Sequence, residues 1–154
     1  MFIKKITKDT PMIILFKNII YDNFIELSKD PLLKHTKEDI DQLLQSESMR
    51  GFYIRDNDKI IAYLFGEIII LNDGRKVFFI SYIFVSPQYR NKKIGNYLMD
   101  KIINTFTLDN LYDGIMLICN TNDKFIFNFY SKKEFIYDKI LRRYLKYDVL
   151  YKKN

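Results

Sequence analysis

Several residue types are scarce in this chain of 154 residues, and each scarcity excludes a class of protein. Trp is absent, Cys119 is the single cysteine and His35 is the single histidine. One cysteine cannot form an intramolecular disulfide, which excludes a disulfide-stapled secreted domain and is typical of a reducing compartment. We expect Cys119 to pack in a buried strand and His35 to lie exposed in a loop, which argues against a Cys–His catalytic pair.

The chain also lacks a long hydrophobic run. Residues 12–16 form an apolar cluster that is too short to span a membrane, and the charged residues Lys17, Asp22 and Glu26 come soon after it. No secretory signal pattern is visible at the N-terminus. We therefore expect a soluble, intracellular (cytoplasmic) protein without a membrane partner.

Acidic residues are fewer than basic ones, 19 against 25, which gives a formal net charge of +6. Such a surface attracts anions, among them coenzyme A, acidic substrates and nucleic acid. The excess charge lies in short separate pairs, which are typical of solvated faces and argue against nucleic acid as the partner. These pairs are Lys4-Lys5, Lys132-Lys133, Arg142-Arg143 and Lys152-Lys153.

Hydrophobic periodicity predicts one domain over residues 1–154, with no linker, repeat or low-complexity tract. The patterns indicate an α/β (α+β) fold, a mixed central sheet of about seven strands flanked by about four helices. Thr36 and Asp39 resemble a capping box that opens the second helix. The expected strands cover residues 2–8, 51–55, 59–71, 76–86, 113–119, 134–138 and 142–151, and the expected helices 12–28, 36–44, 93–107 and 124–132.

A short basic loop joins the fourth strand to the central helix. Pro87 ends the strand because it has no N–H to donate, and the helical stripe starts at Ile94. The first turn of a helix leaves backbone N–H groups free, and Gly95 lets an anion approach them closely. Arg90, Lys92 and Lys93 bring positive charge to the same place. The stretch predicts a phosphate site, and an ordinary solvated basic loop stays open as the alternative.

The pattern V85-x-P87-x-Y89-R90-x-x-K93-I94-G95-x-x-L98 resembles the signature of the GNAT superfamily, the acyl-CoA-dependent N-acyltransferases. That signature reads V-x-P-x-x-R/Q-x-x-G-x-G/A-x-x-L between a strand and a helix. Arg90 and Gly95 match it, whereas Lys93 stands where the first glycine usually lies. The resemblance implies that the loop amides bind the pyrophosphate of coenzyme A. The cofactor-binding residues that it implies are Ile83, Phe84, Val85, Arg90, Asn91, Lys92, Lys93, Ile94, Gly95, Asn96, Asn122 and Tyr130.

Residues 122–135 resemble the second GNAT signature, roughly N-x-x-A-x-x-[FL]-Y-x-x-x-G-F. Tyr130 and Phe135 match its spacing. The departures are Asp123 at the Asn position with Asn122 one residue away, Ile126 for Ala and Glu134 for Gly. The resemblance implies that Tyr130 donates a proton to the departing coenzyme A thiolate. The alternative is a core aromatic residue whose hydroxyl is satisfied.

The reaction that the resemblance implies is acetyl transfer from acetyl-CoA to a primary amine of a small molecule or protein. The amine attacks directly through a tetrahedral intermediate, without a metal, and N–H groups near residues 83–85 polarise the carbonyl. Many relatives carry a catalytic carboxylate on the fourth strand, yet residues 78–85 contain none. Glu67 on the adjacent strand is the candidate base; an exposed strand glutamate, or water held by Ser81 or Tyr82, stays open.

A second interpretation is a degenerate GNAT fold that binds acyl-CoA or a protein partner without catalysis. The departures at Lys93, Ile126 and Glu134, together with the missing carboxylate on the fourth strand, motivate it. The sequence leaves open the acceptor amine, the biological role and whether the chain forms a homodimer.

Overall fold

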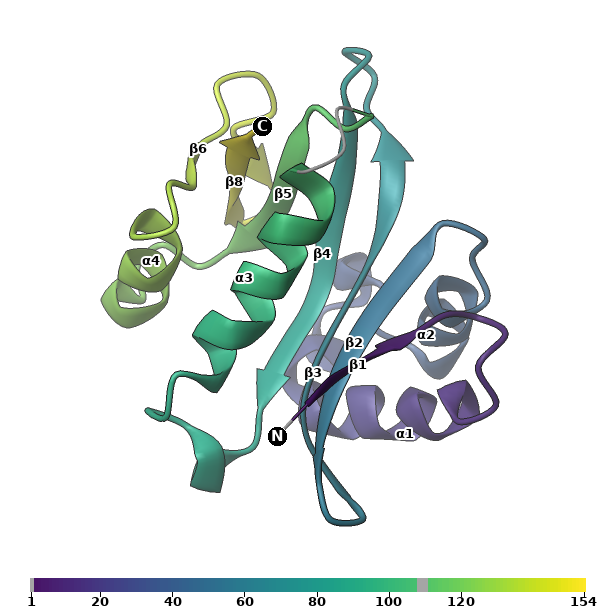
Figure 1. Cartoon of the computed structure of the whole chain (residues 1–154). Coiled ribbons are helices and arrows are strands. Elements are labelled where there is room, and N and C mark those ends of the chain that lie inside the picture. The colour runs from purple at the N-terminus through teal and green to yellow at the C-terminus, as the bar shows by residue number, and fades with distance from the viewer. Residues whose placement is uncertain (1, 108–110) are drawn as a thin grey trace. The chain divides into compact units, whose positions relative to one another are not determined.

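The computed structural model describes residues 2–107 and 111–154. These residues form eight strands and four α-helices, which confirms the predicted mixed α/β arrangement (Figure 1). The strand count exceeds seven because the last predicted strand breaks at a hairpin into two. The elements are β1 (Ile3–Ile6), α1 (Ile13–Asn23), α2 (Lys37–Leu44), β2 (Met49–Asp56), β3 (Lys59–Ile70), β4 (Lys76–Val85), α3 (Ile94–Thr107), β5 (Gly114–Cys119), α4 (Lys124–Ser131), β6 (Ile136–Tyr137), β7 (Arg143–Tyr144) and β8 (Tyr147–Lys153).

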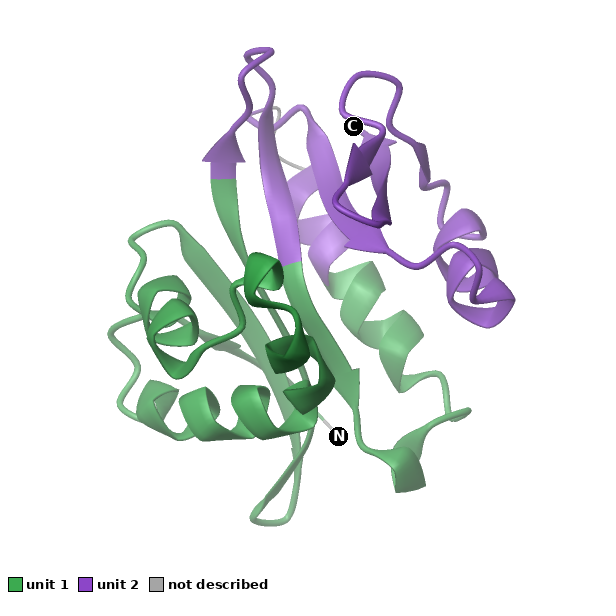
Figure 2. Ribbon diagram, turned by 180° about the vertical axis from the view of Figure 1, so that it is seen from behind, with its two compact units in different colours: residues 1–68, 81–101 green, residues 69–80, 102–154 purple. Residues whose placement is uncertain are grey.

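The chain divides into two compact units, coloured separately in Figure 2. Unit 1 holds residues 1–68 and 81–101, and unit 2 holds residues 69–80 and 102–154. Neighbouring strands run β1-β2-β3-β4 in unit 1 and β4-β5-β8-β6 in unit 2, where β7 also pairs with β8. The sheet is mixed because β4 pairs with β5 in parallel while β1–β2, β2–β3 and β5–β8 are antiparallel. No helix in the described ranges is long and apolar enough to cross a membrane.

In unit 1, α1 and α2 cover one face of the strands (Figure 1). Phe16 of α1 is fully buried, and its ring meets the rings of Tyr63 and Phe65 at 5.9 and 4.9 Å. Helix α1 ends at Asn23, five residues before the predicted end, and a 3₁₀ turn comes next over Ile25–Lys29. Phe24 leaves the helical conformation and packs its ring 5.0 Å from that of Tyr82. Aromatic packing thus overrides the helical stripe.

Helix α2 begins with the predicted capping box. The backbone N–H of Asp39 donates to the Thr36 hydroxyl at 3.0 Å, and the Thr36 N–H donates to the Asp39 carboxylate at 3.1 Å. Two N-terminal donors are satisfied in this way, and Ile40, Leu43 and Leu44 turn one face into the core.

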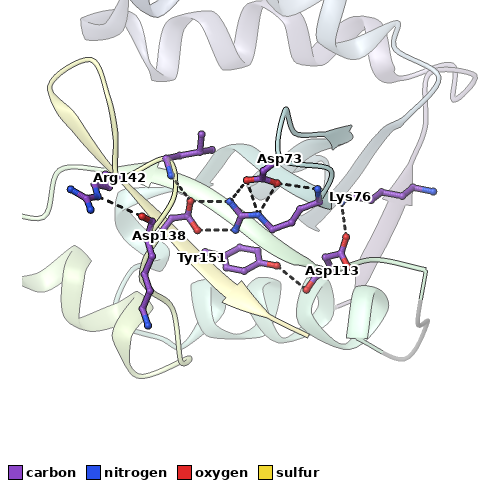
Figure 3. A network of polar contacts seen from close by, with 9 residues as sticks. Asp73, Lys76, Asp113, Asp138, Arg142 and Tyr151 are labelled. Carbon is purple, nitrogen blue, oxygen red and sulfur yellow. Dashed lines mark hydrogen bonds and ion pairs between the residues drawn. The ribbon is translucent and has the colours of Figure 1, made fainter.

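In unit 2, a charged network joins the turn before β4 to the segment after β6 (Figure 3). Arg75 donates through both terminal nitrogens to Asp138, at 2.8 and 3.0 Å, and it also pairs with Asp73. The Asp138 side chain is 3% exposed and accepts a further hydrogen bond from the Leu141 N–H. The guanidinium lies 4.6 Å from the ring centre of Tyr151. An ion pair that is largely shielded from water therefore contributes to the stability of unit 2.

We expect Arg75→Met to lower the free energy of unfolding by about 3 kcal/mol at neutral pH, because the buried Asp138 carboxylate loses its partner. The hydrogen bond from Arg75 lowers the pKa of Asp138, so the folded state binds that proton less readily than the unfolded state. The stabilisation is therefore present at neutral pH and disappears as the pH falls below about 4. Denaturant titrations at several pH values measure both effects.

The control for this experiment is Arg55→Met, since Arg55 pairs at 3.2 Å with the fully exposed Asp58. That substitution should change the stability little. Equal losses in the two variants, or a loss at Arg75 that does not shrink in acid, would contradict the role assigned to the buried pair.

Candidate active site

The predicted phosphate loop is held to its surroundings at both ends. The Ser86 N–H donates to the Ile61 carbonyl at 2.8 Å, and a 3₁₀ turn comes next over Pro87–Tyr89. The Tyr89 hydroxyl donates to the carboxylate of Asp56, the last residue of β2, and this bond raises the pKa of Tyr89. The loop therefore leaves β4 in a defined direction.

Arg90 bridges the loop internally. Its Nε donates to the Val85 carbonyl at 2.8 Å, and its guanidinium carbon lies 5.7 Å from the Phe84 ring centre. The Nε–H group is thus used to fix the side chain. The terminal nitrogens have no hydrogen-bond partner among residues 2–107 and 111–154 and can bind a ligand. Ile83, Phe84 and Val85 themselves are half-buried at the end of β4.

Two residues of the loop, Asn91 and Lys93, have left-handed backbone conformations with φ of 62° and 65°. A side chain at such a φ is strained, which is the physical reason for a glycine at this point of a turn. Lys93 occupies the position of the first glycine in the GNAT signature. The chain therefore departs from the signature in residue type while its backbone keeps the left-handed turn.

Helix α3 begins directly after this turn. The Lys93 carbonyl accepts the first helical hydrogen bond, from the Tyr97 N–H at 3.0 Å. The N–H groups of Ile94, Gly95 and Asn96 consequently have no partner within the helix. With the exposed side chains of Arg90, Lys92 and Lys93, they make a cationic surface suited to a pyrophosphate.

The second motif lies in unit 2, where α4 carries Tyr130. Asp123 caps the helix, accepting from the N–H groups of Phe125 and Ile126 at 3.1 and 3.2 Å. Asn122, the residue before the cap, is exposed. Glu134 replaces the second-motif glycine and has φ of 69°. Both glycine positions that the chain fills with other residues are therefore left-handed.

Tyr130 is 7% exposed, and its ring packs edge-on against Phe129 and Phe135. Burial raises the pKa of Tyr130, and Cys119 adds to the rise, so the phenol stays protonated at neutral pH. Its hydroxyl has no hydrogen-bond partner among the described residues. No buried side-chain oxygen there lacks a partner, so this hydroxyl touches solvent. The side chain is a core aromatic residue whose protonated hydroxyl is not completely enclosed.

Cys119, the last residue of β5, is half-buried, whereas the sequence pattern predicted a buried residue. Burial raises the pKa of its thiol to about 11, with Asp148 and Asp123 contributing. The thiol is therefore protonated at neutral pH and is a poor nucleophile.

The expectation of an exposed His35 is wrong, because the side chain is only 2% exposed. Its Nδ1 lies 2.8 Å from the Tyr82 hydroxyl and its Nε2 lies 3.2 Å from the Tyr21 carbonyl. The polar residues around His35 in the chain concealed these contacts, which join residues up to 47 positions apart.

Glu67 is half-buried on β3, and the strand register gives its face. It pairs directly with Met49, which lies in the core cluster of α1, α2, Tyr63 and Phe65. Directly paired residues share a face, so Glu67 lies on the α1–α2 side of the sheet. Within the described residues, its carboxylate has no hydrogen bond or ion pair.

In the part of the chain that the structure describes, no group of His, Cys, Asp and Glu side chains is arranged to hold a metal ion. Unit 1 brings together the loop of residues 83–96, and it also holds Glu67. Unit 2 holds Asn122 and Tyr130.

The family model described as "Acetyltransferase (GNAT) family" matches residues 16–135 of the chain. Arabidopsis thaliana NAA60 in complex with acetyl-CoA is a similar structure, with a TM-score of 0.72, 11% identity and coverage of 99% of this chain and 98% of that chain. Tetrahymena GCN5 gives a TM-score of 0.70 at 17% identity, with 99% and 96% covered. A GNAT-family acetyltransferase from Staphylococcus aureus gives 0.67 at 23% identity, with 99% of both chains covered. No curated protein matches the chain.

The left-handed turn at Lys93 can be tested by exchanging lysines for glycine. Lys93→Gly should raise the free energy of unfolding by about 0.5–1 kcal/mol. The substitution removes about 1–2 kcal/mol of backbone strain and adds an entropic cost of about 0.5–1 kcal/mol. Lys92→Gly is the matched control, because Lys92 lacks the positive φ and the substitution should destabilise the chain. Thermal unfolding measures both, and a change of the same sign in both variants would contradict a strained turn.

Proposed function

Because the chain belongs to the GNAT acetyltransferase family, we propose that it transfers the acetyl group of acetyl-CoA to a primary amine of a small molecule or protein. The observation that carries the proposal is the β4–α3 loop. It combines a left-handed backbone at Lys93, free N–H groups at the start of α3 and three exposed cationic side chains. These features lie inside the region that the family model matches.

The pyrophosphate of coenzyme A binds at this loop. The N–H groups of Ile94, Gly95 and Asn96 donate to its oxygens, and Arg90, Lys92, Lys93 and Asn91 surround it. Gly95 carries no Cβ, so the phosphate can approach the helix backbone. The bond between Arg90 and the Val85 carbonyl holds the guanidinium in place before the ligand arrives, which reduces the entropy lost on binding.

The end of β4 holds the acetyl-pantetheine arm. The parallel pairing of β4 with β5 is limited to Val77–Phe79 and so ends before Ile83, Phe84 and Val85. Backbone N–H groups in this last part of β4 can therefore bind the arm and the oxyanion that forms when the amine attacks the thioester carbonyl.

Two proton transfers accompany the attack. The amine nitrogen must lose a proton, and Glu67, an unpaired carboxylate on the α1–α2 side, is one candidate to accept it directly or through water. The departing thiolate takes a proton from Tyr130, whose phenol is protonated at neutral pH and whose hydroxyl reaches solvent. Asn122, at the start of the same helix, contacts the coenzyme.

Acetyl-CoA should raise the thermal midpoint by several degrees at about a hundred times its dissociation constant, where binding adds about 2.7 kcal/mol. Arg90→Ala and Gly95→Glu should reduce this shift, the first by removing a fixed charge and the second by adding a carboxylate at the helix N-terminus. Arg55→Ala, a cation outside the loop, should keep it.

Adenosine bisphosphate and an unrelated polyanion serve as ligand controls. An equal shift with the polyanion, or a full shift in both loop variants, would mean that the loop is simply basic and would remove the basis of the proposal.

Tyr130→Phe should lower the turnover number while the affinity for acetyl-CoA stays the same, because the ring packing is kept and only the proton donor is lost. We expect a loss of about 100-fold, the lower end of the range for general acid catalysis. Steady-state release of coenzyme A across pH measures it. A variant with wild-type turnover at every pH would exclude Tyr130 as the acid.

The competing function is binding of acyl-CoA without catalysis, which the absence of a carboxylate in residues 78–85 favours. A broad panel of amines decides between the two. Coenzyme A release above background with any amine supports the enzyme, and tight acetyl-CoA binding with no release from any amine supports the binding protein.

A further inference from the structure

The chain has one histidine, and the proposed function does not use it. His35 lies in unit 1 between the 3₁₀ turn Pro31–Leu33 and helix α2. Its ring stacks on that of Tyr21, with 5.4 Å between centroids and 2° between planes. The ring is thus fixed in position and nearly dry, at 2% exposure.

The hydrogen bonds of His35 determine its tautomer. The Tyr21 carbonyl, 3.2 Å from Nε2, can only accept, so Nε2 carries the proton. In the neutral ring Nδ1 is then an acceptor, and the Tyr82 hydroxyl at 2.8 Å donates to it. Among the described residues, Nδ1 is therefore a base whose hydrogen-bond partner is the Tyr82 hydroxyl.

Tyr82 connects this base to the site described above. It is half-buried on β4, directly before Ile83, and its ring packs in the cluster on the α1–α2 side of the sheet, the side on which Glu67 lies. Burial, with a contribution from Asp39, raises the pKa of Tyr82 to about 12. Tyr82 is therefore a neutral phenol at neutral pH. It can accept one proton and donate another in the same step, and it is neutral again afterwards.

We propose that His35, acting through the Tyr82 hydroxyl, accepts the proton that the attacking amine loses. The inference rests on the proposed function and gives the proton a route that does not pass through Glu67. As the ammonium N–H bond breaks, its proton moves to Tyr82 Oη and the proton of Tyr82 moves to His35 Nδ1. The freed lone pair attacks the acetyl carbonyl, and the C–S bond breaks as the tetrahedral intermediate collapses. The thiolate takes the Tyr130 proton, and the second proton of the former ammonium restores Tyr130. Tyr82 ends neutral, and His35 ends as an imidazolium that later returns its proton to solvent.

The hydrogen-bond partners of His35 can satisfy both its neutral and its protonated ring without a change in heavy-atom positions. In the imidazolium, Nε2–H still donates to the Tyr21 carbonyl and the new Nδ1–H donates to Tyr82 Oη. The Asp39 carboxylate interacts favourably with this charge, and its pKa is lowered chiefly by hydrogen bonds from Thr36 and further by Lys34 and His35. Lys34 precedes His35, and Lys37 of α2 places its Nζ 5.3 Å from the Tyr21 ring centre. The other charged residues on the surrounding helices are Glu38 and Asp41 of α2 and Lys17 and Asp22 of α1.

The test compares Tyr82→Phe and His35→Gln with the wild type on two acceptors, a strongly basic amine and a weakly basic amine that is already neutral at the assay pH. With the basic amine both variants should lose about 100-fold in kcat/KM. With the weakly basic amine the loss should be much smaller, because no proton has to be removed before attack. Tyr53→Phe is the matched control; it removes another buried hydroxyl of unit 1, bonded to Met12 sulfur at 3.0 Å, and should leave both rates unchanged.

A second measurement combines NMR of the wild type with the pH profiles of the wild type and of His35→Gln. Because there is one histidine, the imidazole ¹⁵N signals report His35 without assignment, and we expect the Nε2–H tautomer at high pH. The midpoint of its titration should coincide with an acid limb of kcat/KM that is absent in His35→Gln.

The outcomes separate this inference from the proposed function. A wild type that binds acetyl-CoA but releases no coenzyme A with any amine overturns both. An active wild type overturns the inference alone if the two variants lose equally with both amines, if they lose only thermal stability, or if the NMR and kinetic midpoints differ.

Discussion

The position of strand β4 between β3 and β5 in the sheet is the constraint on which the other features depend. Its aromatic and β-branched residues pair with β5 in unit 2 and pack on α1 in unit 1, so the backbone of β4 cannot shift along the sheet. The loop of residues 86–93 begins where this strand ends, and Tyr82 projects from it toward His35. The cofactor loop and the candidate proton relay are thus placed by one rigid element, which is how precise sites are usually supported.

Strain is kept at the two positions where the chain lacks the glycines of the GNAT signatures. Lys93 and Glu134 both have positive φ, and each costs of order 1 kcal/mol. The strain at Lys93 is not offset in the free protein, because a cation beside the start of α3 is favourable only toward a bound anion. Glu134 accepts a hydrogen bond from Lys152 at 2.9 Å, an exposed pair that contributes little.

The surroundings of the titratable groups determine which of them donate protons and which accept them. Burial keeps the phenols of Tyr130 and Tyr82 protonated, so each can donate a proton at neutral pH. The carboxylate of Glu67 and the Nδ1 atom of His35 are acceptors, and both lie in unit 1. A transferase of this kind needs one group to take the proton of the amine and another to protonate the thiolate. Glu67 and the Tyr82–His35 relay are the candidates for the first task, and Tyr130 is the candidate for the second.

The sequence by itself determined the features that arise within a few neighbouring residues: the helical stripes, the Thr36–Asp39 capping box, the turn before α3 and both GNAT motifs. Turn chemistry, capping and periodicity act over one or two turns of the chain, so they can be read from order alone. Only the tertiary structure decided the burial of His35, the face of Glu67 and the pairing of Arg75 with Asp138, 63 residues away. These three features depend on which distant segments the sheet brings together. Those segments exclude water from the side chains, and this desolvation changes the pKa values and hydrogen bonds that the linear chain could not reveal.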